Sequence, residues 1–238
     1  MNHIEQLYLQ IIHNTCTQTS SNITISQDVS ISLINLAQTQ SSLPFLLPYI
    51  KDSSLLANIK YQTKLMMLNY YQIEQFTRRI ADLFDANNIS YILLKGISLA
   101  AFYPVPEYRQ LGDVDIYIND KEMFNRANAL LLANGYTKDD EISDHHQGYL
   151  YKVPQTGRTM RLELHYRIVG LYQYAPVNKI VDDVFAANTF SPAMQTVNDR
   201  NYPVLPPTEY TFYMIHHMLK HYLYSGFGIR LLDRKSVV

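Results

Sequence analysis

The sequence predicts an α+β fold in which a small mixed β-sheet is flanked by helical segments at both ends of the chain. Three observations predict it. Residues 1–88 carry apolar side chains at helical spacing, residues 89–170 contain short apolar or alternating runs typical of strands, and residues 171–238 return to helical spacing. These three segments are the predicted domain organisation: an N-terminal helical region, an α/β core and a C-terminal helical region.

The N-terminal segment is interpreted as a helical scaffold. Apolar positions at helical spacing predict helices over residues 4–12 and 28–38, and a long helix that ends near residue 86. Ser53 or Ser54 is the expected N-cap of the long helix, because a serine hydroxyl accepts a hydrogen bond from a free amide of the first turn.

The core segment alternates between strand and helix signals. A buried strand is expected over residues 91–94, followed by a glycine turn at 95–96 and a brief helix over 97–103. A loop over residues 104–112 then leads to a second strand at 113–118 and a capped helix at 121–133. Pro104 and Pro106 forbid continuation of the brief helix. Asn119 or Asp120 is the expected cap of the later helix, and Gly135 suits its C-terminal end.

An antiparallel hairpin is predicted next, with strands over residues 147–153 and 159–169 and a turn at residues 154–157. Alternation divides the second strand into a polar and an apolar face. Its polar face carries Arg161, Glu163, His165 and Arg167, and its apolar face carries Leu162, Leu164, Tyr166 and Ile168. Beyond it, Asn178 is expected to cap a helix over residues 179–187, a strong helix ends near residue 224, and residues 229–238 begin another helical pattern.

Composition excludes several classes of protein. The net charge of −1 gives no general electrostatic reason to bind nucleic acid or an anionic membrane. Cys16 is the single cysteine, which excludes an intramolecular disulfide and a cysteine-based zinc site. Neither a signal peptide nor an apolar run long enough to span a membrane is evident, so a cytoplasmic location is expected.

Asp113 and Asp115 are the first candidate site residues. They are two positions apart in a predicted strand, so both carboxylates should leave the same face. Two such charges repel unless a divalent cation neutralises them, and magnesium prefers carboxylate oxygens. The alternative is that both acids simply solvate the end of an edge strand.

A strand, a Lys-Gly turn and a helix precede those acids, and this order is more specific than any one piece. Glycine permits close backbone approach, and free amides at a helix start favour phosphate. Lys95, Gly96 and Ser98 are therefore candidates for holding a triphosphate. The alternatives are that Lys95 is a solvated lysine at a strand end, that Gly96 forms an ordinary tight turn, and that Ser98 caps a helix. Arg109 could bind phosphate bidentately, or could be exposed or paired with Glu107.

Several later residues are candidates for the same site. Glu163 is an acid inside a half-apolar strand, and its alternative is an ion pair with Arg161 or Arg167. His165 shares its face and could contact phosphate, orient an acid or deprotonate a hydroxyl, although a structural role is favoured. His217 and His221 are four residues apart on a predicted helix, and a structural or substrate-facing role is favoured because the glutamate of a zinc-protease motif is absent. The pair at residues 145–146 lies in an acidic loop and is expected to be solvated.

The block YILLKGISLAAFYPVPEYRQLGDVDIYI, followed by RLELHYRI and LPPTEYTFYMIHHMLKH, resembles a poorly characterised bacterial nucleotidyltransferase family within the DNA polymerase beta-like superfamily. The resemblance runs through most of the chain and is sharpest over residues 92–118. It implies that Gly96 and Ser98 form the nucleotide-side turn, that Asp113 and Asp115 bind metal, and that Glu163 is the third acid. Ile97 stands between the glycine and the serine, where the superfamily's commoner turn has serine directly after glycine.

The main functional hypothesis is metal-dependent transfer of a nucleoside monophosphate from a nucleoside triphosphate to an unknown hydroxyl acceptor. Two Mg²⁺ ions, or Mn²⁺, are the expected cofactors, held by the three acids. The expected nucleotide-binding residues are Lys95, Gly96, Ser98, Arg109 and Gly112. One alternative is a non-catalytic nucleotide sensor or interaction module on the same fold, and another is a toxin-like enzyme that modifies protein or transfer RNA. The chain ends at LLDRKSVV, where relatives are expected to continue through further helix.

Overall fold

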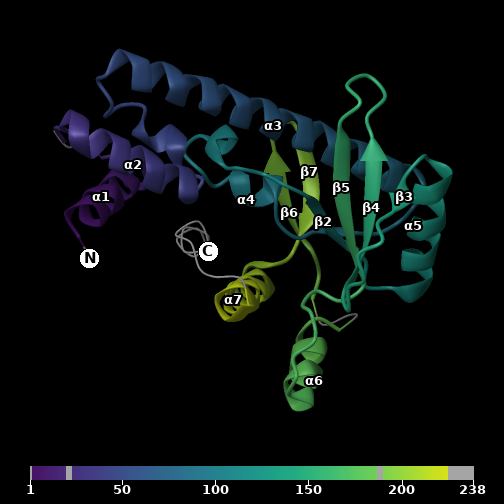
Figure 1. The fold of residues 1–238 in the computed structure, drawn as a ribbon. Helices are drawn as coiled ribbons and strands as arrows, with labels where there is room; N and C mark the ends of the chain where they lie inside the picture. Colours follow the sequence, from purple (N-terminus) through teal and green to yellow (C-terminus); the bar gives the residue numbers. More distant parts are fainter. Residues whose placement is uncertain (1, 20–22, 187–189, 225–238) are drawn as a thin grey trace.

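The computed structural model describes residues 2–19, 23–186 and 190–224, without the side chains of residues 221 and 224 (Figure 1). Within these residues the α-helices are α1 (His3–Thr17), α2 (Gln27–Thr39), α3 (Ser53–Ala86), α4 (Ile97–Ala100), α5 (Lys121–Ala133), α6 (Ala175–Val184) and α7 (Pro207–Tyr224). Two 3₁₀ turns are η1 (Leu43–Leu46) and η2 (Pro106–Tyr108). The strands are β1 (Ile92–Leu93), β2 (Val114–Tyr117), β3 (Thr137–Lys138), β4 (His146–Lys152), β5 (Thr159–His165), β6 (Ala193–Val197) and β7 (Arg200–Val204). The α+β class predicted from the sequence is confirmed.

The strands form one mixed sheet in the order β3-β4-β5-β2-β1-β7-β6. β2 pairs parallel to β5, and β1 pairs parallel to β7, while the other neighbouring pairs are antiparallel. The β2–β5 register places Asp115 opposite Glu163 and Tyr117 opposite His165. Since residues opposite each other on paired strands project from the same face, the sheet itself brings the two acids together.

One face of the sheet is covered by α3 and α5. Figure 1 shows α3 running along the sheet, from α1 and α2 at one end to α5 at the other. The core on this side combines the C-terminal half of α3 with side chains of α5 and of the central strands: Tyr70, Ile73, Phe76, Ile80, Phe84, Ala127, Leu131, Val114, Ile116, Tyr149, Leu162 and Leu164. These buried apolar side chains supply the main hydrophobic stabilisation of the sheet.

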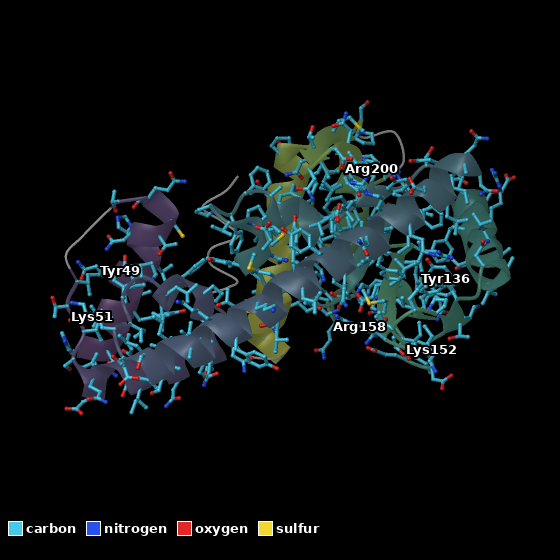
Figure 2. The ribbon with its side chains drawn as sticks, turned by 90° about the horizontal axis from the view of Figure 1, so that it is seen from above. Tyr49, Lys51, Tyr136, Lys152, Arg158 and Arg200 are labelled. Carbon is cyan, nitrogen blue, oxygen red and sulfur yellow. The ribbon has the colours of Figure 1, made fainter. Side chains whose placement is uncertain are left out.

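α3 also belongs to a second core, formed with the N-terminal helices. Its Ile59 packs with apolar residues of α1, α2 and η1, among them Ile11, Leu33 and Leu46. Figure 2 shows α3 spanning the molecule, from Tyr49 and Lys51 at the N-terminal end to Tyr136 and Lys152 at the other. One continuous helix therefore fixes the N-terminal bundle against the sheet.

Two arginines hold α3 from either side, as Figure 2 shows. Arg158, from the loop between β4 and β5, donates to the side chains of Asn69 and Gln72. Arg200 of β7 pairs with Asp82 and Asp85 near the other end of the helix.

The opposite face of the sheet is covered only in part. A smaller core joins β1 and the end of β2 to α4, α6 and α7 through Ile92, Leu94, Leu99, Tyr117, Val181, Tyr210, Tyr213 and Met214. The residues of β2 and β5 that carry acids and histidines lie on this face, beside that apolar cluster.

Two predicted helix caps are wrong. Asp52 caps α3 instead of Ser53 or Ser54, since its carboxylate accepts from the amides of Ser54 and Leu55 at 2.9 and 3.0 Å. α6 begins at Ala175, before Asn178, and the Asn178 side chain accepts from the Tyr172 amide at 2.7 Å. The predicted helix end at residue 187 and the pattern over residues 229–238 lie outside the described residues.

The predicted strand over residues 159–169 ends early, at His165. The amides of Tyr166 and Arg167 bond to the carbonyl of His145, which takes the chain out of the sheet. Tyr166 is consequently 45% exposed and does not join the apolar face as predicted. Arg167 pairs with Asp182 of α6 at 2.6 Å.

The sequence did not predict β6 and β7, which lie inside the segment expected to be helical. They form an antiparallel hairpin in which Val197 pairs with Arg200, and β7 adds this hairpin to the sheet beside β1. Asn198 in the turn has a φ of 55°, a left-handed conformation that asparagine tolerates better than most residues. Asn198 and Asp199, which lie between two short runs, are the sequence feature that could have predicted this hairpin turn.

Candidate active site

The site is built around two carboxylates that face each other across β2 and β5. Asp115 is 1% exposed, and its register partner Glu163 is largely buried. Carboxylate oxygens of both residues and a ring nitrogen of His165 all lie within 4.8 Å of one another. Asp113 immediately precedes β2 and is more exposed. The structure thus places one predicted acid inside a central strand and another just before the start of that strand.

Lys95 lies between the two aspartates. Its Nζ atom is 2.8 Å from Asp115 Oδ2 and 3.7 Å from Asp113 Oδ1. Gly96 follows at a φ of 79°, a conformation that L side chains rarely adopt, although a Cβ there would meet only the Asp113 carbonyl at 3.8 Å. The glycine is therefore required by backbone conformation, and it turns the chain so that Lys95 stays over the acids.

The charges in this cluster determine one another's protonation. Burial would raise the pKa of the Asp115 carboxyl, but Lys95 and His165 outweigh it and hold that pKa well below its usual range. The negative charge of Asp115, together with burial, raises the pKa of Asp113. For Lys95, burial acts to lower the pKa, and the two aspartates more than compensate and raise it. The result is a buried Lys95–Asp115 ion pair with Asp113 as a repelled neighbour.

His165 links the two buried acids. Its Nε2 atom is 3.3 Å from Asp115 Oδ1 and 3.6 Å from Glu163 Oε2. Burial alone would lower the pKa of His165, but hydrogen bonding to these carboxylates raises it. Burial acts to raise the pKa of Glu163, but the hydrogen bond to His165 and the charges of Lys95 and His146 together outweigh it and lower that pKa. These contacts fit two of the roles predicted for His165, orienting an acid and a structural role, and its function stays a prediction.

A cavity of about 480 Å³ opens over the acids. The predicted site residues that line it are Lys95, Gly96, Arg109, Gly112, Asp113, Asp115, Glu163 and His217. They come from the β1–α4 turn, the loop before β2, the two acid-bearing strands and α7. Residues far apart in the sequence therefore converge on one polar hollow large enough for a nucleotide-sized ligand.

The predicted site residue Ser98 is placed away from the cavity. Ser98 is buried, and its hydroxyl donates to the Lys95 carbonyl at 3.4 Å, so it does not line the cavity. The side chain of His221 lies outside the described residues. Arg109 is buried and donates to the Gly96 carbonyl at 3.3 Å, which makes the exposed-loop alternative wrong and ties the approach loop to the glycine turn.

The alternative role for Glu163, an ion pair with Arg161, is present but loose. Arg161 Nη2 is 3.7 Å from Glu163 Oε1, and the same nitrogen lies closer to Glu141 and to Asp139. The other oxygen, Oε2, faces His165 and the Nδ1 atom of His146, at 3.7 Å from the latter. Glu163 therefore keeps one oxygen directed at the buried cluster.

Sequence reasoning missed His145 and His146, which were expected to be solvated. His146 is 8% exposed and begins β4 opposite His165. The ring of His145 contacts the His146 ring edge to face and the His165 ring at a tilt. Burial lowers the pKa of both, that of His145 to about 4. The predicted strand began at residue 147, one residue later than β4 begins, so the prediction did not place His146 opposite His165.

Comparison with known proteins fits these observations. Residues 32–233 match a family model described as "Uncharacterised nucleotidyltransferase". The chain belongs to this uncharacterised nucleotidyltransferase family. A search of curated proteins found no match. Among solved structures, an antigenic nucleotidyltransferase-like protein from Paracoccidioides brasiliensis is 18% identical, with a TM-score of 0.40 and 73% of each chain covered. The bacterial origin and the wider polymerase beta-like superfamily stay predictions.

Within the described part of the chain, none of the helices combines the length and apolar character that crossing a bilayer requires.

Proposed function

We propose that this family member transfers a nucleoside monophosphate from a nucleoside triphosphate to a hydroxyl group of an acceptor. The observation that carries the proposal is the pairing of Asp115 with Glu163 across parallel strands, in a cavity that also holds Asp113 and Lys95. Phosphoryl-transfer sites need carboxylates to hold cations and fixed positive groups to hold phosphate oxygens. Both kinds of group line this cavity.

The donor set suits a hard divalent cation. Asp115 and Glu163 offer oxygens within 4.8 Å of each other, and Asp113 lines the same cavity. The ammonium of Lys95, 2.8 Å from Asp115 Oδ2, already shows that the acids attract a cation. We assign these three acids to Mg²⁺, with two ions expected and Mn²⁺ as a substitute. Bound magnesium would neutralise the triphosphate and the leaving pyrophosphate and lower the pKa of the attacking hydroxyl.

The remaining residues bind and orient. Lys95 stays charged because its pKa is raised, so it can move from the acids to a phosphate oxygen without gaining or losing a proton. Arg109 holds the Gly96 carbonyl and thereby the turn that faces the phosphates. His165 donates toward Asp115 and keeps that carboxylate ionised and correctly oriented.

A neighbouring groove is the proposed route for the acceptor. It has a volume of about 320 Å³, is lined by α2 and α3 residues such as Gln38, Gln62 and Asn69, and shares Gln110 and Leu111 with the acid cavity. Among the described residues, those that line it are amides, a serine and apolar side chains, without a charged group. The acceptor is therefore proposed to present its hydroxyl on a neutral, polar portion of the molecule.

Calorimetric titration of ATP and CTP in Mg²⁺ tests the site. The wild type should bind at least one nucleotide, and Asp113→Asn/Asp115→Asn should lose that binding. The matched control is Asp28→Asn/Asp140→Asn, which removes the same charge from exposed positions and should bind like the wild type. Unchanged binding in the site double variant would disprove the assignment.

Pyrophosphate release separates the enzyme from the nucleotide-sensor alternative. With a panel of hydroxylated acceptors, the enzyme should release pyrophosphate in proportion to the modified acceptor. Tight nucleotide binding without release for any acceptor would favour the sensor.

A further inference from the structure

Three histidine rings gather at one end of β4 and β5, beside the acids. His145 precedes β4, His146 begins it, and His165 ends β5 in register with His146. The ring centroids are 4.6 Å apart for His145 and His146, 5.0 Å for His146 and His165, and 5.4 Å for His145 and His165. One ring nitrogen from each histidine lies within 4.8 Å of the other two.

Hydrogen bonds prepare His145 as a metal ligand. Its Nδ1 atom lies 2.7 Å from Asp144 Oδ1, an arrangement in which the carboxylate holds the proton on Nδ1 and leaves a lone pair on Nε2. That Nε2 atom lies 3.3 Å from Nδ1 of His146. Two nitrogens bound tetrahedrally to one zinc ion, at bonds of about 2.0–2.1 Å, are separated by about 3.3 Å. The pair already stands at the spacing of two ligands.

His165 carries the second, independent observation. Its Nε2 atom faces the Asp115 carboxylate at 3.3 Å, so Nδ1 is the nitrogen left over. This Nδ1 atom is buried, in a residue that is 3% exposed, and has no hydrogen-bond partner in the described structure. Buried polar atoms in native proteins normally have partners, so this nitrogen calls for a ligand.

We propose that His145, His146 and His165 form a binding site for one divalent transition-metal ion of the zinc class, separate from the magnesium site. Imidazole nitrogens suit zinc, cobalt and nickel, whereas magnesium selects oxygen ligands. Three protein ligands leave a fourth position open. A cavity of about 70 Å³ is lined by His145 and His165 and also by Asp115 and Glu163, and it has room for a water in that position.

The site would couple to the acids through His165. A metal ion on Nδ1 of His165 keeps the proton on Nε2, where it points at Asp115. Metal binding would also join the start of β4 to the end of β5. The inference does not depend on nucleotidyl transfer, because the three histidines can bind an ion whether or not a nucleotide reacts nearby.

The test is a cobalt titration of the full chain without a polyhistidine tag, stripped with a chelator and dialysed. Excess Mg²⁺ is present so that the carboxylates are occupied. One Co²⁺ per chain should bind with the strong visible absorption of a low-coordinate site, and one equivalent of Zn²⁺ should abolish that spectrum. Absence of stoichiometric binding would overturn the inference.

Variants assign the ligands. His145→Ala and His146→Ala should each weaken cobalt binding at least tenfold, whereas His13→Ala, at an exposed histidine of α1, should bind cobalt like the wild type. Unchanged binding in both site variants would refute the proposal. If either variant fails to fold, X-ray absorption of the zinc-loaded wild type decides instead: three imidazole ligands are expected, and fewer would overturn it.

Asp113→Asn keeps the two sites distinguishable, since it should leave cobalt binding unchanged. If the wild-type protein binds a nucleotide in Mg²⁺ but does not bind cobalt, the proposed histidine site is wrong and the proposed function stands. Intact cobalt binding in a protein that binds no nucleotide would count against the proposed function alone.

Discussion

The two faces of the central sheet are made by the same strands and serve opposite purposes. Along β5, Leu162 and Leu164 pack under α3, while Glu163 and His165 on the other face join the charged cluster. The difference lies in what covers each face. α3 and α5 close one side with apolar side chains, whereas α6 and α7 cover the other only beside β1 and the end of β2. One face therefore stabilises the fold, and the other concentrates charges that the fold must hold together.

Asp113→Asn should have the largest effect and act on the open face alone. Loss of one metal-binding carboxylate should cost several kcal/mol of transition-state stabilisation, which lowers the rate of pyrophosphate release at least about 100-fold. The free energy of unfolding, measured by urea titration with a chelator present, should stay equal or rise.

The expected direction of this stability change follows from the pKa of Asp113, which is raised in the folded state by Asp115. Above the unfolded pKa the ionised carboxylate disfavours folding, so stability should fall as pH rises through the raised folded pKa, and the asparagine removes this penalty. A clear loss of metal-free stability in Asp113→Asn would contradict the contrast between the faces.

Leu164→Ala probes the closed face. Deleting a fully buried leucine side chain should lower the free energy of unfolding by about 2–5 kcal/mol, because it leaves a cavity under α3. Denaturant titration gives this value. Nucleotide affinity, measured without denaturant, should change little. A loss of affinity as large as in the acid variants would contradict the separate roles of the two faces.

Asp115→Asn should differ from Asp113→Asn in stability, although both remove one charge. Asp115 is buried against Lys95 and His165, so its loss leaves a buried ammonium without its closest partner. The free energy of unfolding should fall by about 3 kcal/mol. Equal stability of the two variants in urea would show that the Lys95–Asp115 pair is not the buried interaction described.

Gly96→Ala and Gly112→Ala make the smallest and best-matched comparison. Gly96 has a φ of 79°, so an alanine there should cost roughly 1–2 kcal/mol of stability and displace Lys95. Gly112 lines the same cavity, has no such φ and has no atom within 4 Å of an added Cβ, so its alanine variant should fold normally. Thermal unfolding of the pair measures the difference; a cost at Gly112 equal to that at Gly96 would argue against strain as its cause.

Local patterns predicted much of this architecture. The long α3, the strand and glycine turn at Lys95–Gly96 and the β4–β5 hairpin follow from spacing, apolar runs and turn residues. The convergence of Glu163 with Asp115 was suggested by the family resemblance, and no local pattern fixes the parallel β2–β5 pairing that produces it. Long-range pairing depends on contacts between distant segments, which a single sequence does not display.

The missed features share that cause. β6 and β7 are short, and β7 contains Pro203, so their strand character comes mainly from pairing with each other and with β1. His145 and His146 looked like an exposed acidic loop, and only the register with His165 buries them. Ser98 looked like a phosphate ligand because of its place after the glycine, but the helix turns its hydroxyl back to the Lys95 carbonyl.

A crystal structure with a non-hydrolysable nucleoside triphosphate and Mn²⁺ tests the assignment of the open face most directly, because manganese is located by its anomalous scattering. The predicted result is manganese bound by Asp113, Asp115 and Glu163, with the triphosphate beside the Lys95–Gly96 turn. A triphosphate bound elsewhere, or manganese that leaves these three carboxylates without a metal contact, would contradict it.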